Sequence, residues 1–317
     1  MLCALNFRRF FFTFFFLLTV LTVTACSVSA GESAYLIQDS TTGFVLEKSH
    51  ADRELQIASL TKIATAVVVL DWADASNANL SQMATVPATA SNLRTTSGVG
   101  LRTGDRCSIR DLLYAALMQS DNVAAETLAD HVGRALAGDN LSKPATVVFV
   151  SQMNALATKL GMLHTRFLNA HGLDTLERKL PYSTAEDLAK LTRYAMENSA
   201  FRFHVAQKER RINFLIGGVE PTSYLLRNTN ELIGYRSVDG VKTGTTRRAG
   251  ACLILSEARP PESRKEGETH LITPRRLNVI ILNCPERFER AKELLQHGWD
   301  LYDAWAAAGR PIPTPKK

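Results

Sequence analysis

The sequence of 317 residues predicts an α+β fold, in which one antiparallel sheet is built from both chain ends and a helical insertion packs against it. Three observations predict this fold. Strand-like segments occur near the start, within residues 33–48, and they return beyond residue 205. Between these two regions, the apolar residues recur at helical spacing. One sheet shared by both ends and covered by the helices is the most economical arrangement.

The first predicted elements are a hairpin and a buried helix. Residues 33–39 and 43–48 are strand-like and flank a Ser-Thr-Thr-Gly turn. Residues 63–70 are almost wholly apolar and contain neither glycine nor proline, so they are predicted to form a buried helix. Ser59 and Lys62 lie at its start, three positions apart, which places hydroxyl and amine on one face. Burial would lower the pKa of the lysine, although a helix cap and a lysine reaching for solvent are the simpler interpretation of these two residues alone.

The middle of the chain is predicted to be helical. Residues 76–106 show few strong patterns and are expected to form loops and short pieces. Further helices are predicted after the cap at Ser108, from about Val123, from Val147 to Leu160, and after residues 183–187.

Strands return in the last third. They are predicted at residues 211–216, 239–244, 251–255 and 277–282. Residues 258–276 are charged and contain two adjacent prolines, so they are expected to form an exposed hairpin loop. An amphipathic helix is predicted at residues 288–305, with a buried face of Leu294, Leu295, Trp299, Leu301 and Tyr302.

The N-terminus has the pattern of an export signal. A pair of arginines precedes an apolar stretch, and small residues follow it. We therefore expect a signal peptide at residues 1–30, which ends either in a lipobox with a lipidated Cys26 or at a cleavage site after Ala30. An uncleaved anchor is disfavoured because the stretch is short for a membrane span. Residues 31–305 would form the catalytic domain, and residues 306–317 a frayed, proline-rich tail.

Composition and cysteine spacing argue against nucleic-acid binding and zinc binding. The net charge is +6, but no basic run is interleaved with aromatic residues, so no nucleic acid is expected as a partner. Cys107, Cys252 and Cys284 remain beyond the signal segment, an odd number without zinc-ligand spacing. No metal or cofactor is expected. Cys252 and Cys284 lie in strand-like runs, where two buried thiols are favoured over a disulfide.

Three short motifs occur in order along the chain. They are Ser59-Leu60-Thr61-Lys62 at a helix start, Ser120-Asp121-Asn122 between helices, and Lys242-Thr243-Gly244 in a strand. Together they are typical of penicillin-binding proteins and class A β-lactamases. The lactamase interpretation is disfavoured because no Glu-x-x-Leu-Asn segment, which would activate the deacylating water, lies between the second and third motifs.

From about residue 33 to 305, the chain resembles the low-molecular-mass penicillin-binding proteins, the D-alanyl-D-alanine carboxypeptidase family of serine peptidases. Secondary signatures agree with this resemblance, at residues 167–173, 182–188, 228–230, 239–241 and 249–250. It implies a β-lactamase/transpeptidase-like fold, peptidoglycan stem peptides as substrates and β-lactams as covalent inhibitors. A lipid on Cys26 would add the membrane as a partner.

The resemblance also implies a role for each motif residue. Ser59 would be the nucleophile, Lys62 the general base with Lys242 helping to keep it neutral, and Ser120 a proton relay. Substrate binding is expected from Asn122, Lys242, Thr243, Gly244 and Thr245. The backbone N–H groups of Ser59 and Thr245 would form the oxyanion hole.

Some assignments stay open at this stage. His171 lies near the cleft in the family, but a structural or exposed histidine is favoured. Thr229 stands where some relatives carry arginine, and Arg247 and Arg248 are expected to lie in a solvated turn. A DD-endopeptidase that cuts peptidoglycan cross-links uses the same residues and is the main alternative to a carboxypeptidase. A non-catalytic penicillin-binding sensor is disfavoured because every catalytic position is present.

Overall fold

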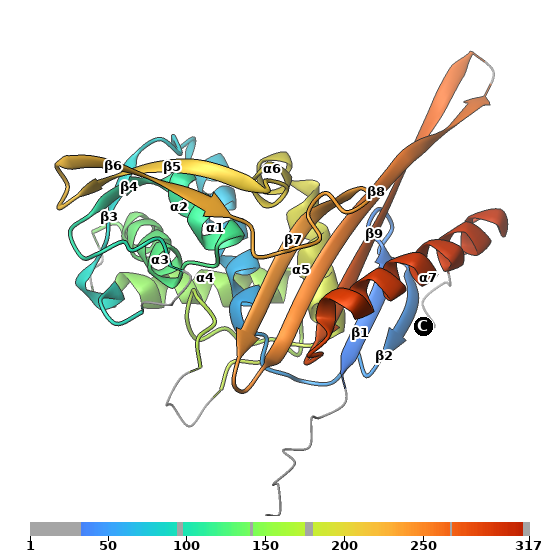
Figure 1. The fold of residues 1–317 in the computed structure, drawn as a ribbon, viewed down its shortest axis with the longest axis horizontal. Helices are drawn as coiled ribbons and strands as arrows, with labels where there is room; N and C mark the ends of the chain where they lie inside the picture. Colours follow the sequence, from blue (N-terminus) through green and yellow to red (C-terminus); the bar gives the residue numbers. More distant parts are fainter. Residues whose placement is uncertain (1–32, 94–97, 140–141, 175–179, 267, 313–317) are drawn as a thin grey trace, which may run out of the picture. The chain divides into compact units, whose positions relative to one another are not determined.

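The computed structural model describes residues 33–93, 98–139, 142–174, 180–266 and 268–312. Cys26, Ala30 and the predicted signal peptide lie outside these residues. The described part contains a five-stranded antiparallel sheet in the order β2-β1-β9-β8-β7 (Figure 1). Its strands are β1 (Ala34–Asp39), β2 (Val45–Ser49), β7 (Val238–Thr246), β8 (Gly250–Glu266) and β9 (Thr269–Leu282). The predicted sheet from both chain ends is therefore confirmed.

A helical layer covers one face of this sheet. Its elements are the 3-10 helix η1 (Ala58–Leu60) and the helices α1 (Thr61–Ser76), α2 (Ile109–Met118), α3 (Asn122–Ala137), α4 (Ala145–Lys159), α5 (Ala185–Glu197) and α6 (Ser199–Val205). Every residue from 61 to 70 is buried, as predicted. Ser108 and Thr184 cap α2 and α5 by accepting hydrogen bonds from the N–H groups of Asp111 and Asp187.

A second, four-stranded sheet corrects the prediction of a single sheet. Its order is β3-β4-β5-β6, with β3 (Met83–Thr85), β4 (Arg106–Ser108), β5 (Glu209–Ile216) and β6 (Glu220–Arg227). The predicted strand 211–216 thus belongs to this sheet, and β6 was not predicted. Its only buried side chain is Leu226, so β6 lacks the apolar alternation from which strands are recognised. A short 3-10 helix, η2 (Ala88–Ala90), lies in the loop after β3.

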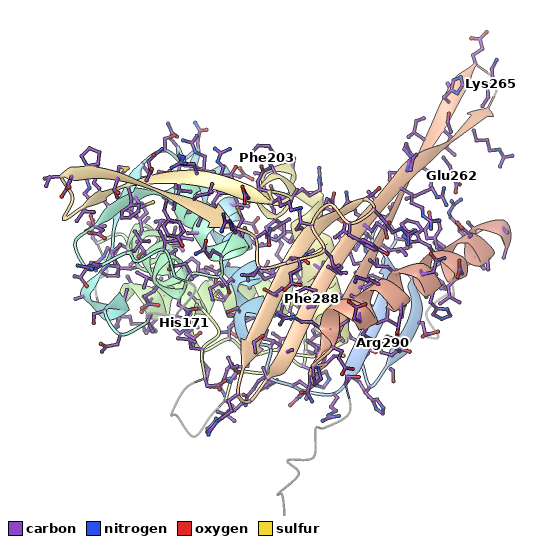
Figure 2. All side chains as sticks on the ribbon, viewed as in Figure 1. His171, Phe203, Glu262, Lys265, Phe288 and Arg290 are labelled. Carbon is purple, nitrogen blue, oxygen red and sulfur yellow. The ribbon has the colours of Figure 1, made fainter. Side chains whose placement is uncertain are left out.

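The segment 258–276 is not a loop, as was expected, but the outer part of the β8–β9 hairpin. Pairing continues to Glu266 opposite Thr269, with a shift of register between Arg259 and Glu262, where the two prolines lie. Figures 1 and 2 show this ribbon extending beyond the rest of the sheet, with Lys265 near its tip. A strand with one covered face alternates apolar and polar residues. Both faces of the outer ribbon are open to solvent, so charged residues occupy positions that would otherwise be apolar.

Helix α7 (Arg287–Ala307) covers the other face of the five-stranded sheet. Along β8, alternate residues serve the two layers: Ile254 belongs to the core under the helical layer, whereas Leu253 and Leu255 pack with Leu294 of α7. The predicted buried face of α7 is confirmed for Leu294, Leu295, Trp299 and Tyr302. Leu301 is only half-buried, and Ala291 and Trp305 are buried instead.

The cysteines and the end of the chain complete the fold. Cys107, Cys252 and Cys284 are free thiols, and only Cys284 is partly exposed. The expectation of thiols rather than a disulfide is confirmed, but of the two thiols expected to be buried, only Cys252 is. Residues 308–312, which we expected to be frayed, are held against the hairpin and α7. Arg310 Nη2 donates to Glu262 Oε2 of β8 at 2.6 Å, and Trp305 Nε1 of α7 donates to Pro311 O at 3.1 Å.

Candidate active site

Ser59 and Lys62 stand where η1 joins α1. The side chain of Lys62 is fully buried, and its Nζ lies 2.9 Å from Ser59 Oγ. The same nitrogen contacts Asn122 Oδ1 at 2.7 Å and the backbone oxygen of His171 at 2.6 Å. The prediction that hydroxyl and amine share one face of the helix is therefore confirmed.

The partners of Lys62 bear on its protonation state. Burial lowers the pKa of Lys62 to about 7, although the carboxylate of Asp121 acts in the opposite direction. A neutral amine has two N–H donors and one lone pair. Asn122 Oδ1 and His171 O accept hydrogen bonds and cannot donate them, so they take the two N–H groups. The lone pair is then left for the hydroxyl of Ser59, which is the arrangement that a general base requires.

The turn between α2 and α3 carries the second motif. Asp121 caps α3, because its Oδ1 accepts from Ala124 N and its Oδ2 from Val99 N, both at 2.7 Å. Ser120 is half-buried and has a φ of +63°, a conformation that residues other than glycine rarely adopt. The middle residue of the motif thus holds the turn that carries Ser120 and Asn122.

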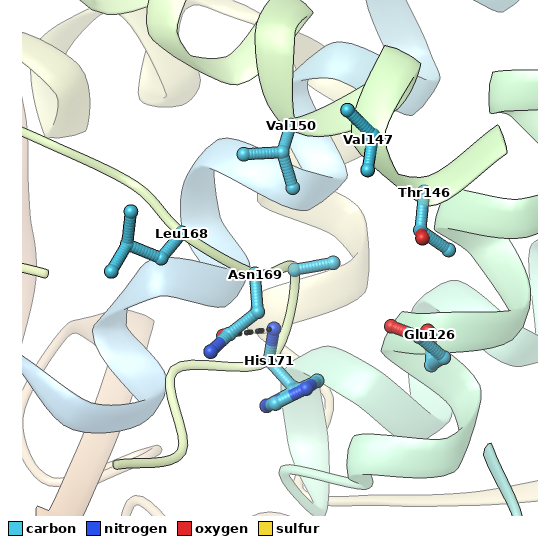
Figure 3. A pocket seen from close by; sticks show the side chains of 8 residues that line it. Glu126, Thr146, Val147, Val150, Leu168, Asn169 and His171 are labelled. Carbon is cyan, nitrogen blue, oxygen red and sulfur yellow. Dashed lines mark hydrogen bonds between the residues drawn. The ribbon is translucent and has the colours of Figure 1, made fainter. Parts of the chain in front are cut away.

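A short loop after α4 supplies the backbone oxygen that contacts Lys62. Asn169 Oδ1 accepts from the N–H group of His171 at 3.2 Å (Figure 3). It also accepts from the N–H group of Gly172 at 2.6 Å. Leu173 N donates to His171 Nδ1 at 3.1 Å. Burial, with a smaller effect of the Lys62 charge, lowers the pKa of His171 to about 3, so the ring is neutral. The structure thus favours a structural role for His171. Its backbone oxygen accepts a hydrogen bond from Lys62 Nζ, and its ring accepts one from Leu173 N within the loop.

Strand β7 lies against η1 at Gly244. A Cβ at this position would lie 3.0 Å from Ile57 O and 3.1 Å from Ser59 N, which is closer than nine in ten such contacts. Glycine therefore permits the approach of the strand to the backbone of the serine. The edge strand of the five-stranded sheet thus runs alongside the start of the helix that carries Lys62.

Lys242 is the second buried lysine of the site. Its Nζ donates to Thr243 O at 2.9 Å. Burial lowers its pKa well below the ordinary value, and the charges of Lys62 and Arg287 add to this shift. The repulsion that we expected between Lys242 and Lys62 is present, and burial is the largest cause of the lowered pKa of both amines.

The site extends along β7 through Thr243 and Thr245, and Arg287 of α7 contacts it there. Thr243 Oγ1 lies 2.6 Å from Thr229 Oγ1, so Thr229 orients that hydroxyl. Thr245 is exposed, and its Oγ1 accepts from Arg287 Nη1 at 2.7 Å. The same nitrogen donates to Gly244 O at 2.9 Å.

Arg287 was missed in the sequence because its place beside β7 depends on how α7 packs. One signal was present. A cation in the first turn of a helix opposes the helix dipole, so an arginine there suggests a role other than helix stability. Arg247 and Arg248 are exposed in the turn after β7, in line with the solvated turn that we expected.

The structure thus brings together the predicted residues other than Ser120, whose place is given only by the turn that it shares with Asn122. Contacts join Ser59, Lys62 and Asn122, and the approach of Gly244 brings Lys242, Thr243 and Thr245 beside them. Among the described residues, no group of three or more His, Cys, Asp or Glu could hold a metal ion. Within the same ranges, no helix is both long enough and apolar enough to cross a membrane.

Comparison with known proteins identifies this arrangement. The sequence model of the D-alanyl-D-alanine carboxypeptidase family matches residues 20–264. The chain belongs to this family. It is 33% identical to the D-alanyl-D-alanine carboxypeptidase DacC of Escherichia coli K12, over 89% of this chain and 64% of that protein. It is 34% identical to a D-alanyl-D-alanine endopeptidase of Pseudomonas aeruginosa, over 69% of this chain and 65% of the relative.

The fold of the family is also the fold of this chain. Penicillin-binding protein D2 of Listeria monocytogenes, solved in an ampicillin-bound form, superimposes with a TM-score of 0.64. The sequences are 28% identical, and the superposition covers 84% of this chain and 96% of that one. The chain spans just under two thirds of the length of the carboxypeptidase and the endopeptidase that it matches.

Proposed function

We propose that this protein is a serine D-Ala-D-Ala carboxypeptidase that acts on peptidoglycan stem peptides and is acylated by β-lactams. The observation that carries the proposal is the fully buried Lys62 amine, 2.9 Å from Ser59 Oγ and with a pKa near 7. An amine with this pKa is largely neutral above pH 7, and its other partners only accept hydrogen bonds, so it is suited to remove the serine proton.

The proposed reaction has two steps. Ser59 Oγ attacks the carbonyl carbon of the penultimate D-alanine, and its proton passes to Lys62 Nζ. The C–N bond then breaks, and Ser120 relays a proton to the leaving D-alanine amine, which leaves an ester on Ser59. Water hydrolyses that ester and regenerates the serine.

The oxyanion hole would be formed by backbone N–H groups of Ser59 and Thr245. Support comes from Gly244, which holds β7 close to Ser59 N. Loss of one such donor typically lowers the rate by about 10²–10³-fold.

The remaining residues would hold the substrate. Asn122 Oδ1 is occupied by Lys62, so its Nδ2 group is the part left to meet the substrate amide. The terminal carboxylate would bind to the hydroxyls of Thr243 and Thr245, with positive charge from Lys242 and Arg287. Arg287 supports this placement because it already donates to Thr245 Oγ1.

Labelling with a fluorescent penicillin tests the assignment. Wild type should form a covalent adduct and release D-alanine from a peptide that ends in D-Ala-D-Ala, whereas Ser59→Ala should do neither. Adduct formation that survives in Ser59→Ala would refute the nucleophile. Adduct formation in wild type without release of D-alanine would instead favour the non-catalytic penicillin-binding sensor.

A DD-endopeptidase is the second candidate, and the similarity to a protein of that name favours it. Digestion of purified sacculi separates the two activities. Loss of terminal D-alanine alone indicates a carboxypeptidase, whereas conversion of cross-linked dimers to monomers indicates an endopeptidase.

We also propose export to the cell envelope. The signal-like residues 1–30 support it, as does a wall-linked substrate. The catalytic domain would span residues 31–305. Mass spectrometry of the mature N-terminus decides between lipidation of Cys26 and cleavage after Ala30.

A further inference from the structure

The four-stranded sheet has one face that the proposed reaction does not use. Side chains alternate along β5 and β6, and Ile212 and Leu226 are buried in the core that these strands share with α2. The opposite face, which we call the outer face, carries Arg211, Asn213 and Leu225, and all three are exposed. Figure 1 shows β5 and β6 over α2 and away from α7. The outer face is therefore available to a partner.

A groove of about 650 Å³ crosses the outer face. Part of its lining is apolar, from Met83 and Leu215, and Arg110 adds a positive charge. Asp111 also lines the groove, but it is only 9% exposed, and its Oδ2 lies 3.4 Å from the N–H nitrogen of Asn213. A groove of this size that combines apolar walls with a few polar groups is typical of a site that binds a ligand.

The outer face carries more positive than negative charge. Arg106, Arg110 and Arg211 are exposed, and within the part of the chain that the structure describes, none of the three forms an ion pair. Glu209, an acidic residue of the same face, is paired with Arg227 at 3.1 Å. Three guanidinium groups are thus left without a counter-charge, so the outer face is complementary to an anionic partner.

Exposed aliphatic side chains accompany these arginines. Val219, at the tip of the β5–β6 hairpin, is 81% exposed, and Leu225 of β6 is 39% exposed. Arg106 reaches the same tip, because a Cβ at Gly218 would lie 3.3 Å from Arg106 Cδ. Glu220, which pairs with Ile216, belongs by alternation to the opposite face of the sheet.

This combination indicates the class of partner. At a membrane surface, aliphatic side chains enter the apolar boundary while basic side chains meet anionic headgroups. A polar anionic polymer would neutralise the arginines, but it would leave the aliphatic side chains in water. The aliphatic tip beside Arg106 therefore favours a membrane.

We propose that the outer face of the four-stranded sheet docks on a membrane surface that contains anionic phospholipid. The guanidinium groups of Arg106, Arg110 and Arg211 would bind headgroup phosphates. Val219 would enter the apolar boundary, and the groove would hold one lipid against its apolar wall. The inference does not depend on the proposed reaction, because these residues lie outside the catalytic site.

Vesicle binding tests the proposal. Partition of the mature protein is measured by co-sedimentation with vesicles of phosphatidylcholine, either pure or with about one quarter phosphatidylglycerol, at roughly 0.1 M salt. One basic residue at an anionic surface is worth about fivefold in partition. Wild type should therefore prefer the anionic vesicles by about 100-fold, and Arg106→Gln/Arg110→Gln by about fivefold. A lipid on Cys26 would raise binding to both kinds of vesicle and leave this ratio unchanged.

Arg247→Gln/Arg248→Gln is the matched control. It removes two exposed arginines from the turn after β7 and should keep the wild-type ratio within about twofold. A wild-type ratio near one overturns the proposal, and so does an equal loss in the two double variants, which would mean that net charge alone attracts the protein to the vesicles.

Two further measurements address the tip and the class of partner. Val219→Asp should weaken binding to the anionic vesicles at least about fivefold, and unchanged binding would overturn the docking of this face. Binding to purified sacculi that is lost in Arg106→Gln/Arg110→Gln, without binding to vesicles, would replace the membrane by a wall polymer. Penicillin acylation at the wild-type rate shows that each variant is folded.

Discussion

At the scale of single residues, the site is unusual in burying two lysine amines close together without an ion pair to either among the described residues. Each amine contacts uncharged oxygen atoms instead: Ser59 Oγ, Asn122 Oδ1 and His171 O for Lys62, and Thr243 O for Lys242. Burial of an ammonium in this way is unfavourable, so the pKa of each amine falls. Burial of Lys62 therefore lowers stability, but it also lowers the pKa of the amine enough for Lys62 to act as a base.

The pH dependence of acylation follows from Lys62. Its pKa is lowered to about 7 in the folded protein, from roughly 10.4 in an unfolded chain. Only the neutral amine accepts the serine proton, so the rate of penicillin acylation should rise with pH through about 7 and then level off. Stopped-flow labelling from pH 5.5 to 9 measures this. Lys62→Arg, which stays protonated, should be slower by at least about 10²-fold and lack the rise. A flat wild-type profile would contradict the role of Lys62.

Gly244 is the second residue with a sharp expectation. In Gly244→Ala, the new Cβ would press on Ile57 O and Ser59 N, so β7 must move away from the serine. If the backbone N–H groups of Ser59 and Thr245 form the oxyanion hole, acylation should slow by about 10²–10³-fold, with little change in far-UV circular dichroism. Labelling kinetics on the folded variant check this. A rate within threefold of wild type would show that the approach at Gly244 is not needed for catalysis.

At the scale of elements, the outer β8–β9 ribbon extends beyond the rest of the sheet (Figure 1). Leu271 and Ile272 are 52% and 55% exposed. The ion pairs that tie the ribbon to α7 and to the residues after it are partly exposed: Arg259 and Arg275 with Asp303, and Glu262 with Arg310. Surface pairs contribute about 0–1 kcal/mol each. The ribbon therefore adds little to the stability of the catalytic body.

Shortening the ribbon tests this separation. Glu262 and Thr273 are paired across the hairpin, so residues 263–272 can be replaced by Asn-Gly, which favours a two-residue turn. Penicillin acylation should stay within twofold of wild type, and the midpoint of thermal unfolding should move by less than about 4 °C. A large loss of acylation would mean that the ribbon supports the site through a path that its contacts do not reveal.

Elements also show what the sequence could and could not predict. The helix at residues 63–70 and the site motifs were predictable because buried apolar runs and motif order are local signals. Strand β6 was not, because solvent covers most of its side chains, and the outer ribbon was taken for a loop because of its charges and prolines. Arg287 and the His171 carbonyl act through tertiary contacts more than 40 residues away in sequence, which no local pattern encodes.

At the scale of the molecule, the described body has three layers, with the five-stranded sheet between α7 and the helical layer (Figure 1). The site lies where layers meet. Ser59 and Lys62 come from η1 and α1, Asn122 from α3, the third motif from the edge strand β7, and Arg287 from α7. A substrate in this site would therefore contact both the helical layer and the sheet.

Acylation should consequently stabilise the fold. A penicilloyl group attached to Ser59 would place its carbonyl oxygen at β7 and its carboxylate near Thr245 and Arg287, contacts that exist only when the layers are together. Interactions present only in the folded state raise the midpoint of unfolding, and we expect an increase of about 3–8 °C in differential scanning calorimetry. Ser59→Ala with the same penicillin is the control and should show no comparable shift. An acylated protein that melts at or below the midpoint of the free protein would show that the adduct does not bridge the two layers.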